Sequence, residues 1–215
     1  MTKGLFITLE GGEGSGKSTQ IERLKERLEK QGYDVVATRE PGGTPEAEKI
    51  RDLLVQRDGG RWTPMAEVLL FFTARIMHVE DLIKPALAEG KIVISDRFTD
   101  STRAYQSAGH GLPADQIEAI NALCLNGFEP DLTLILDIDP KTGIERSLKE
   151  NQTGGTENED RFEKLDLRFH ENLRQGYLDI AGHEPARCKI IDARDGITQI
   201  ADQIAQSVFD KISAR

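Results

Sequence analysis

The chain has 215 residues, with 28 Lys or Arg against 37 Asp or Glu and a formal net charge of −9 at pH 7. This length predicts one compact domain over residues 1–215, and the acidic balance argues against a protein that coats nucleic acid. The longest purely apolar run, Val68–Phe72, is far too short to cross a bilayer.

The first predicted strand, Leu5–Leu9, leads into a glycine-rich segment that fits the phosphate-binding motif G-x-x-x-x-G-K-[ST]. Its glycines allow consecutive backbone N–H groups to surround phosphate oxygens, and the start of the following helix adds positive potential. The motif predicts a nucleoside triphosphate site in which Lys17 reaches the β- and γ-phosphates and Ser18 ligates Mg²⁺. The residues predicted to bind the triphosphate are Gly11, Gly12, Glu13, Gly14, Ser15, Gly16, Lys17, Ser18 and Thr19.

Short apolar runs and helical stripes then alternate along the chain. The further predicted strands are Val35–Ala37, Ile92–Ile94, Leu132–Leu136 and Lys189–Ile191. The apolar stripe Ile21, Leu24 and Leu28 predicts a first helix that ends at Gly32. The pairs Thr44-Pro45 and Thr63-Pro64 each predict a helix start, and the second opens a long helix from Met65 to about Ala88. Two later helices are predicted from the stripes Phe162, Leu165, Phe169, Leu173 and Tyr177, and Ile197, Ile200, Ile204, Val208 and Ile212. The apolar middle of the long helix, Val68–Phe72, is expected to be buried.

Strands that alternate with helices predict an α/β fold, with a five-stranded parallel sheet covered by helices on both faces. Ligands bind beyond the carboxyl ends of such strands. Polar residues follow these ends here, as in Arg39-Glu40 and Asp96-Arg97. With the phosphate-binding motif, the pattern predicts the three-layer P-loop NTPase fold.

The residue types at the strand ends suit phosphoryl transfer, which depends on positioning and on cations rather than on covalent catalysis. Asp96 can hold Mg²⁺ directly or through water, and Arg97 can grip a phosphate with two hydrogen bonds. A helix cap followed by a solvated charge is the plainer interpretation of this pair. The four histidines, His78, His110, His170 and His183, have no triad or metal-ligand spacing.

Two i, i+4 pairs suggest a site for a flat base. Phe71 and Arg75 share one helix face, where a ring and a guanidinium can enclose a base, although Phe71 alone is more often a core residue. Thr102 and Gln106 repeat the spacing around Tyr105. These spacings alone leave the base site a hypothesis.

Two features bear on mobility and on the cellular compartment. The polar segment Asn151–Asp160 between two helices is either a surface loop or a mobile lid over the nucleotide. Cys124 and Cys188 form no C-x-x-C pair, which predicts two reduced, buried thiols in a cytoplasmic protein. Because the chain runs from Met1 almost directly into a strand, we expect no signal peptide.

Taken together, these segments resemble the bacterial thymidylate kinases over essentially the full length of the chain. The resemblance is carried by E-G-x-E-G-x-G-K-[ST] at Glu10–Ser18, T-R-E-P-G-G at Thr38–Gly43, A-E-x-[IL]-R-x-L-L at Ala47–Leu54, E-x-L-x-F-x-x-[AS]-R at Glu67–Arg75, D-R-x-x-[DL]-S-[ST]-x-A-Y-Q at Asp96–Gln106 and P-D-L-T-x-x-L at Pro130–Leu136. It implies ATP- and Mg²⁺-dependent phosphorylation of dTMP to dTDP, which supplies dTTP for DNA replication, by a homodimer. The helix around Val68–Phe72 could supply the dimer interface.

The resemblance also implies roles for individual residues. Glu13 would bind the sugar 3′-hydroxyl of dTMP, and Tyr105 would crowd the 2′ position. Arg97 would clamp the acceptor phosphate, with Arg39 and Arg51 as further candidates. Glu40 and Asp96 would organise Mg²⁺ and its waters. Phe71 would stack on thymine, while Arg75, Thr102 and Gln106 would hydrogen-bond the edge of the base.

The chain departs from the family pattern in one place. Relatives with glycine at the position of Gly14 usually carry several arginines in the lid. In this chain we place the lid at about 146–163. Here that segment is acidic, with Arg146, Lys149 and Arg161 as its nearby cations. We predict Arg161 as the cation at the transferred phosphate, with Arg146 as the second candidate.

Other functions remain open at this stage. The acceptor could be dUMP, UMP or CMP, and one missing methyl group changes binding by only about 1–3 kcal/mol. A nucleoside kinase would need a carboxylate base at the sugar hydroxyl. A P-loop switch protein is the alternative from another class, but a guanine-specific switch needs an N-K-x-D motif, which this sequence lacks. For the adenine pocket the sequence offers only the loop Asp192–Arg194.

Overall fold

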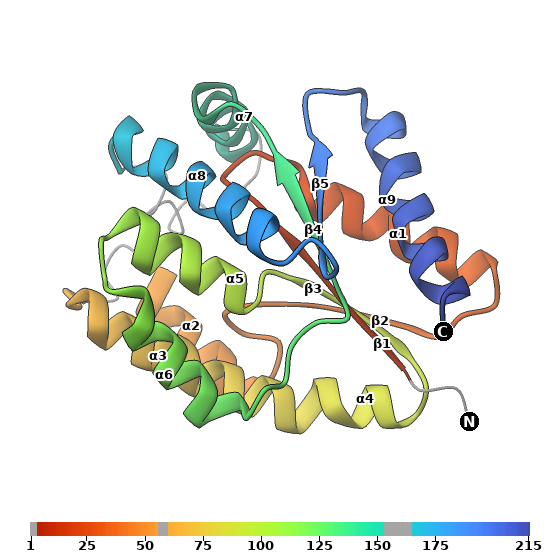
Figure 1. Ribbon diagram of the computed structural model, residues 1–215, viewed down its shortest axis with the longest axis horizontal. Helices are drawn as coiled ribbons and strands as arrows, with labels where there is room; N and C mark the ends of the chain where they lie inside the picture. The colour runs from red at the N-terminus through yellow and green to blue at the C-terminus, as the bar shows by residue number, and fades with distance from the viewer. Residues whose placement is uncertain (1–3, 56–59, 153–164) are drawn as a thin grey trace.

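A parallel sheet of five strands, in the order β2-β3-β1-β4-β5, forms the centre of the computed structural model (Figure 1). The structure describes residues 4–55, 60–152 and 165–215. The strands are β1 (Leu5–Glu10), β2 (Val35–Arg39), β3 (Ile92–Asp96), β4 (Leu132–Asp137) and β5 (Cys188–Asp192). All five predicted strands are confirmed. Most strands extend one or two residues beyond the predicted apolar runs, because polar residues at their carboxyl ends also pair with the neighbouring strands.

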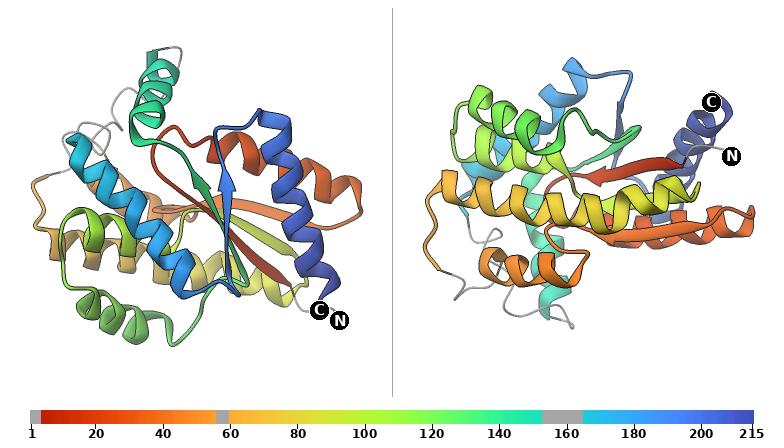
Figure 2. Two further views of the ribbon diagram at one scale, coloured as in Figure 1. Left: turned by 45° about the horizontal axis from the view of Figure 1, so that its top comes forward. Right: turned by 90° about the horizontal axis from the view of Figure 1, so that it is seen from below.

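Helices cover both faces of this sheet (Figure 2). They are α1 (Lys17–Lys30), α2 (Pro45–Val55), α3 (Pro64–His78), the π-helical turn η1 (Val79–Ile83), α4 (Lys84–Ala88), α5 (Thr99–Thr102), the π-helical segment η2 (Arg103–Gly109), α6 (Ala114–Leu125), α7 (Pro140–Gln152), α8 (Leu167–His183) and α9 (Ile197–Ser213). Helices α1 and α9 pack together on one face of the sheet. Helices α3, α4, α6 and α8 cover the other face.

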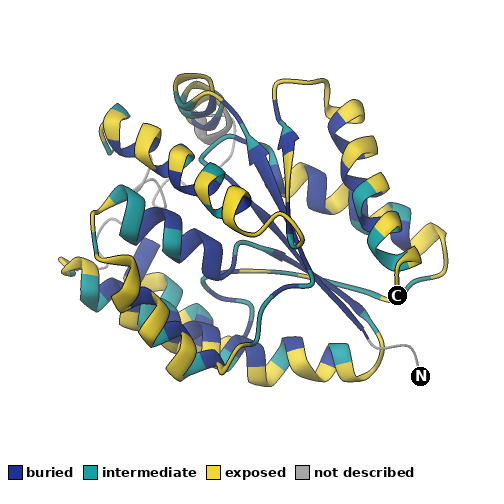
Figure 3. Ribbon diagram, viewed as in Figure 1, coloured by how far each residue is buried: buried dark blue, intermediate teal, exposed yellow. Residues whose placement is uncertain are grey.

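Alternate side chains of β1 point to opposite faces of the sheet and contribute to the hydrophobic core on each face. Leu5, Ile7 and Leu9 pack with α1 and α9, whereas Phe6 packs with α3 and α6. This division follows from the two-residue period of a strand. Figure 3 shows the central strands buried along their length, as expected of a parallel sheet covered on both faces. Glu10, at the end of β1, lies on the same side as Phe6.

The long helix predicted after Thr63 is present, but it contains a π-helical turn. Helix α3 runs through η1 into α4, and the N–H of Lys84 donates to the carbonyl of Val79, five residues earlier. Pro85 offers no N–H and its ring opposes a normal helical turn, which accounts for the wider turn here. The prediction that Val68–Phe72 is buried holds for Val68 and Phe72 but is wrong for Leu69, which is 52% exposed.

Helix α8 begins later than its apolar stripe predicts. The side chain of Asp166 accepts a hydrogen bond of 2.8 Å from the N–H of Phe169 and so caps the helix, which leaves Leu165 outside it. Phe162 lies outside the described residues. Cys188 is buried as predicted, but Cys124 is only half-buried, and both are free thiols. No helix in the described part of the chain is long and apolar enough to cross a membrane.

Candidate active site

The phosphate-binding loop connects β1 to α1 at the carboxyl edge of the sheet. Gly14 and Gly16 adopt positive φ angles of 61° and 88°, which only glycine accepts readily. The Nζ atom of Lys17 lies 3.3 Å from the carbonyl oxygen of Gly11 and 3.2 Å from that of Gly12. Burial and the nearby charge of Arg97 lower the pKa of Lys17. The loop is therefore folded around a buried cation beside the sheet edge.

Beside this loop lies a cavity of about 350 Å³. The structure brings most of the predicted site residues to its walls, from the loop, α2, α3, β3 and the α5–η2 region. These residues are Glu13, Gly14, Ser15, Gly16, Lys17, Ser18, Thr19, Arg39, Glu40, Arg51, Phe71, Arg75, Asp96, Arg97, Thr102, Tyr105 and Gln106. Gly11 and Gly12 lie on the other side of the loop, around a second, smaller pocket. Segments far apart in the sequence thus converge on one cavity.

Asp96 and Ser18 form an oxygen-rich corner of the cavity. The hydroxyl of Ser18 lies 3.5 Å from Oδ2 of Asp96, while Oδ1 of Asp96 is buried with no hydrogen-bond partner among the described residues. Hard oxygen ligands of this kind suit Mg²⁺, which is commonly held by one or two protein oxygens together with phosphates and water. The pair therefore fits a Mg²⁺ site of the kind that the sequence predicts.

Arg97 is held rigidly rather than solvated. Its backbone has a φ of 70°, and its guanidinium donates to the carbonyl of Gly11 at 2.9 Å and to both carboxylate oxygens of Glu13 at 3.3 and 3.4 Å. Tyr105 supports both partners, since its ring lies under the guanidinium and its hydroxyl donates to Glu13. Burial alone would raise the pKa of Glu13, but the charges of Arg97 and Lys17 outweigh it and lower the pKa. The plainer interpretation of Arg97 as a solvated charge is therefore wrong.

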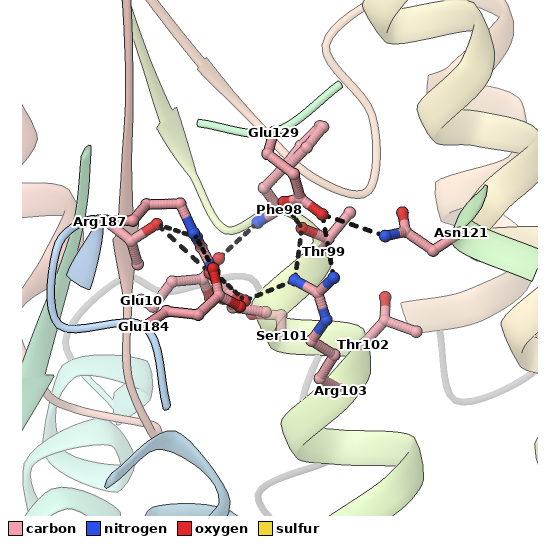
Figure 4. Close-up of polar contacts among 12 residues, drawn as sticks. Glu10, Phe98, Thr99, Ser101, Thr102, Arg103, Asn121, Glu129, Glu184 and Arg187 are labelled. Carbon is pink, nitrogen blue, oxygen red and sulfur yellow. Dashed lines mark hydrogen bonds and ion pairs between the residues drawn. The ribbon is translucent and has the colours of Figure 1, made fainter. Parts of the chain in front are cut away.

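Beneath Arg97 lies a buried acid, Glu10, which the sequence analysis did not single out. Its carboxyl accepts hydrogen bonds from the N–H of Phe98 at 2.8 Å and from the hydroxyl of Ser101 at 2.6 Å (Figure 4). Arg97 also contacts the hydroxyl of Ser101, at 3.2 Å. Burial raises the pKa of Glu10 to about 8, and the negative charge of Asp100 adds to this rise. Glu10 thus ties the turn that carries Arg97 to the end of β1.

Asp100, next to Glu10, has the opposite environment. Arg187 donates to Oδ2 of Asp100 at 2.6 Å and to Oδ1 at 3.1 Å, and Arg103 donates to Oδ1 at 2.8 Å. Although burial would raise the pKa of Asp100, these two arginines lower it. Figure 4 shows how Arg103 also reaches Glu129, so that the α5–η2 segment is anchored to the elements around it. This anchoring fixes the segment that carries the predicted base-binding residues.

The predicted base site has two buried donors that are not used within the described structure. Nη1 of Arg75 and Nε2 of Gln106 have no hydrogen-bond partner among the described residues, although both side chains line the cavity. Nη2 of Arg75 donates to the hydroxyl of Thr102 at 3.1 Å. Phe71 is half-buried at the cavity wall rather than in the core. The pocket therefore offers a ring and two donors to a flat ligand with carbonyl oxygens.

Glu40 lies at the cavity wall but its carboxylate is directed to other side chains. Oε2 accepts from Nε of Arg75 at 2.6 Å, and Oε1 lies 3.0 Å from Nδ1 of His78. This arrangement favours a structural use of Glu40 over metal binding. Arg39 is 54% exposed and pairs with Glu48 at 3.0 Å, and Arg51 donates to the carbonyl of Pro41 at 2.8 Å. Both arginines line the cavity.

The predicted lid residues are only partly described. Nη1 of Arg146 donates to the carbonyl oxygen of Ala193 at 3.1 Å, which joins α7 to the loop proposed for adenine. In that loop Arg194 pairs with Asp192 at 2.6 Å. Arg161 lies outside the described residues. Neither Arg146 nor the loop 192–194 lines the main cavity, so the contact favours a role for Arg146 in shaping this loop.

Sequence reasoning missed several residues that build the site. Glu10 and Ser101 lie inside the motifs Glu10–Ser18 and Asp96–Gln106, so the motifs themselves could have marked both as site residues. Arg187 and Tyr177 had no such signal, because their contacts with Asp100 and Arg97 span 87 and 80 residues of sequence. Such distant pairs become visible only in the folded chain.

A phosphate-binding loop that faces an arginine-lined cavity for a second ligand defines the chain as a P-loop phosphotransferase. Comparison with known proteins identifies the family. The thymidylate kinase family model matches residues 9–204. The chain is 50% identical over 212 residues to a thymidylate kinase of Caulobacter vibrioides, which covers 99% of both chains, and 43% identical over 212 residues to one of Geobacter sulfurreducens, which covers 99% of this chain and 100% of the relative.

A solved structure agrees with this result. The crystal structure of thymidylate kinase from Ehrlichia chaffeensis superposes with a TM-score of 0.76 at 35% sequence identity, covering 95% of this chain and 98% of that one. The chain belongs to the thymidylate kinase family, whose reaction is the ATP-dependent phosphorylation of dTMP to dTDP.

Proposed function

We propose that this chain carries out the reaction of its family with dTMP held between Phe71, Arg75 and Arg97, facing the phosphate-binding loop. The observation that carries this proposal is the pair of buried donors on Arg75 and Gln106 for which the described residues offer no acceptor. Thymine presents carbonyl oxygens that can accept from such donors, whereas cytosine presents an amino group in place of one of them. Leaving buried donors unpaired costs about 1–3 kcal/mol each, so the site favours a ligand that satisfies them.

The residues around the sugar and phosphate complete the proposed acceptor site. Glu13 is the acceptor for the sugar 3′-hydroxyl, and the ring of Tyr105 occupies the space that a 2′-hydroxyl would need. Arg97 grips the acceptor phosphate, and Arg39 and Arg51 add charge at the cavity wall. Phosphate oxygens are already anionic, so this acceptor needs no general base. The protein instead aligns the acceptor phosphate with the γ-phosphate of ATP and supplies positive charge around both.

On the donor side, we infer that the loop residues 11–19 bind the phosphates of ATP. Lys17 moves its ammonium from the loop carbonyls to the β- and γ-phosphates. The hydroxyl of Ser18 and the carboxylate of Asp96 would hold Mg²⁺, whose positive charge would offset the negative charge of the ATP phosphates. Arg161 is proposed as the cation at the transferred phosphoryl group.

We also infer a homodimer that works in the cytoplasm. Leu69 and Ile76 lie seven residues apart on α3, and they are 52% and 36% exposed. Residues at this spacing share one helix face, and exposed apolar side chains there support a protein interface. The two free cysteines support a reducing compartment.

The test is a coupled assay of ADP release with dTMP, dUMP, dCMP, UMP and thymidine as acceptors, and with no acceptor. We expect the highest kcat/KM with dTMP and little ATP turnover without an acceptor. Arg75→Ala should raise the KM for dTMP at least tenfold, while the KM for ATP changes little. Equal turnover without an acceptor would favour a switch protein, and phosphorylation of thymidine would contradict the monophosphate site.

A further inference from the structure

Arg75 is held in place by several contacts with its neighbours. Its guanidinium lies between two rings, 4.8 Å from the centroid of Phe72 and 5.2 Å from that of Phe98. Nε donates to Glu40 at 2.6 Å, and Nη2 donates to the carbonyl of Phe98 and to the hydroxyl of Thr102, both at 3.1 Å. The side chain is only 2% exposed. Within the described part of the chain, these contacts leave Nη1 without an acceptor, and we infer that a ligand uses it.

Glu40 is fixed in turn by His78. Nδ1 of His78 lies 3.0 Å from Oε1 of Glu40, and Nε2 lies 2.7 Å from the hydroxyl of Thr38. A neutral imidazole with its proton on Nδ1 satisfies both contacts, because Nδ1 then donates to the carboxylate and Nε2 accepts from the threonine hydroxyl. His78 is completely buried. The four side chains form one continuous row from Thr38 to Arg75.

The backbone leaves room for this row. Gly43 has a φ of 89°, and a Cβ there would lie 2.5 Å from Nε2 of His78 and 2.6 Å from the hydroxyl oxygen of Thr38. The turn after β2 therefore closes directly over the bond between these two side chains. Any larger residue would push the imidazole away from Thr38 and Glu40.

We propose that His78 is a positioning residue for base recognition, because it holds Glu40 in the orientation that aims Arg75 at the pyrimidine. In space, His78 lies between Thr38 and Glu40, an arrangement that resembles a hydrolase triad. His78 is buried, however, and does not line the cavity. It therefore acts through Arg75 rather than on substrate. This inference rests on the proposed base site, and it adds a residue to which the sequence analysis gave no function.

Two near-isosteric variants separate the two bonds of His78. In His78→Asn the amide nitrogen can take the place of Nδ1 and keep the bond to Glu40. In His78→Gln the amide reaches the position of Nε2 and keeps only the bond to Thr38. The measurements are the Kd values for dTMP and for ATP by calorimetry, the KM and kcat for both substrates, and the Tm of each variant. Arg75→Ala is the reference for a lost base contact.

We expect His78→Gln to weaken dTMP binding about tenfold, the size of one lost hydrogen bond to a charged group. Saturating dTMP should restore kcat, and the Kd for ATP should stay within about twofold. His78→Asn keeps the bond to Glu40 and loses the bond to Thr38, so we expect dTMP binding to weaken only about threefold. Equal losses in the two variants, or a lower Tm with unchanged dTMP affinity, would overturn the positioning role.

Two further results keep the test decisive. If His78→Gln does not fold, Thr38→Val removes only the hydroxyl that fixes the far nitrogen, and we expect dTMP binding to weaken about threefold. Unchanged binding in Thr38→Val would overturn the inference. If Arg75→Ala itself binds dTMP normally, the proposed base site fails, and the inference fails with it. If the His78 variants bind dTMP normally while Arg75→Ala does not, the positioning role fails but the proposed base site stands.

Discussion

At the scale of single residues, two neighbouring buried acids have pKa values that are shifted in opposite directions. Asp100 is kept ionised by Arg187 and Arg103, whereas burial and the charge of Asp100 raise the pKa of Glu10 to about 8. A protonated Glu10 can still hold the turn at Ser101, and it leaves the charge of Arg97 available for a phosphate. The substrate cleft thus stays positive within an acidic protein.

The raised pKa of Glu10 makes stability depend on pH. Between its ordinary value of 4.5 and about 8, the folded chain retains a proton on Glu10 that the unfolded chain loses. The free energy of unfolding should therefore fall as pH rises through this range. Glu10→Gln removes this contribution, because an amide does not ionise there. Urea denaturation at several pH values should show a flatter pH dependence for the variant, and parallel curves would contradict the assignment.

The two candidate lid arginines should behave differently. Arg161→Ala should lower kcat by about 10³-fold, the size expected for a cation at the transferred phosphoryl group. Arg146 instead holds the carbonyl of Ala193, so Arg146→Ala should act mainly on the KM for ATP. Steady-state kinetics with each substrate varied will separate the two, with the exposed Arg23→Ala on α1 as control. Near-normal kcat in Arg161→Ala would refute its role.

At the scale of elements, α7 packs directly against the phosphate-binding loop. A Cβ on Gly14 would lie 2.0 Å from the carbonyl oxygen of Gly143, and one on Gly143 would lie 2.5 Å from the carbonyl oxygen of Glu13. The φ of 61° at Gly14 adds a backbone reason against larger residues. This close approach leaves no room for a larger side chain at Gly14 without a shift of α7.

Gly143→Ala should therefore displace the loop from α7. We expect kcat/KM for ATP to fall at least tenfold and the Tm to fall as well, because the clash is with backbone atoms that have little freedom to move. Gly182→Ala on α8 is the matched control, since a Cβ there meets nothing within 4 Å. That control should raise stability by about 0.5–1 kcal/mol. Normal ATP kinetics in Gly143→Ala would show that the loop tolerates the contact.

At the scale of the whole molecule, the face of α3 that points away from the sheet is the best candidate for subunit contact. Leu69→Glu would place a charge on this face. We expect a fall in apparent mass from dimer to monomer by light scattering after size exclusion. Ile197→Glu is the control, because Ile197 is 54% exposed at the start of α9, which covers the other face of the sheet. An unchanged mass for Leu69→Glu would place the interface elsewhere.

Much of the fold follows from local sequence. The runs at Leu5 and Leu132 form strands because buried parallel strands are apolar throughout, and the motif at Gly11–Ser18 adopts its loop because only glycines accept its backbone angles. The start of α8 and the exposure of Leu69 were predicted wrongly. In both cases an apolar stripe was extended over residues whose environment depends on a cap or on neighbouring elements.

By itself, the sequence determined the strand–loop–helix for phosphate, the order of strands and helices along the chain, and the family, because these depend on residues close together in the chain. Only the tertiary structure decided that Glu10 lies under Arg97, that Arg187 neutralises Asp100, and that His78 and Arg75 share Glu40. Burial raises the pKa of Glu10, the two arginines lower that of Asp100, and Glu40 fixes the position of Arg75. All three effects need residues from separate elements, which only the assembled fold brings together.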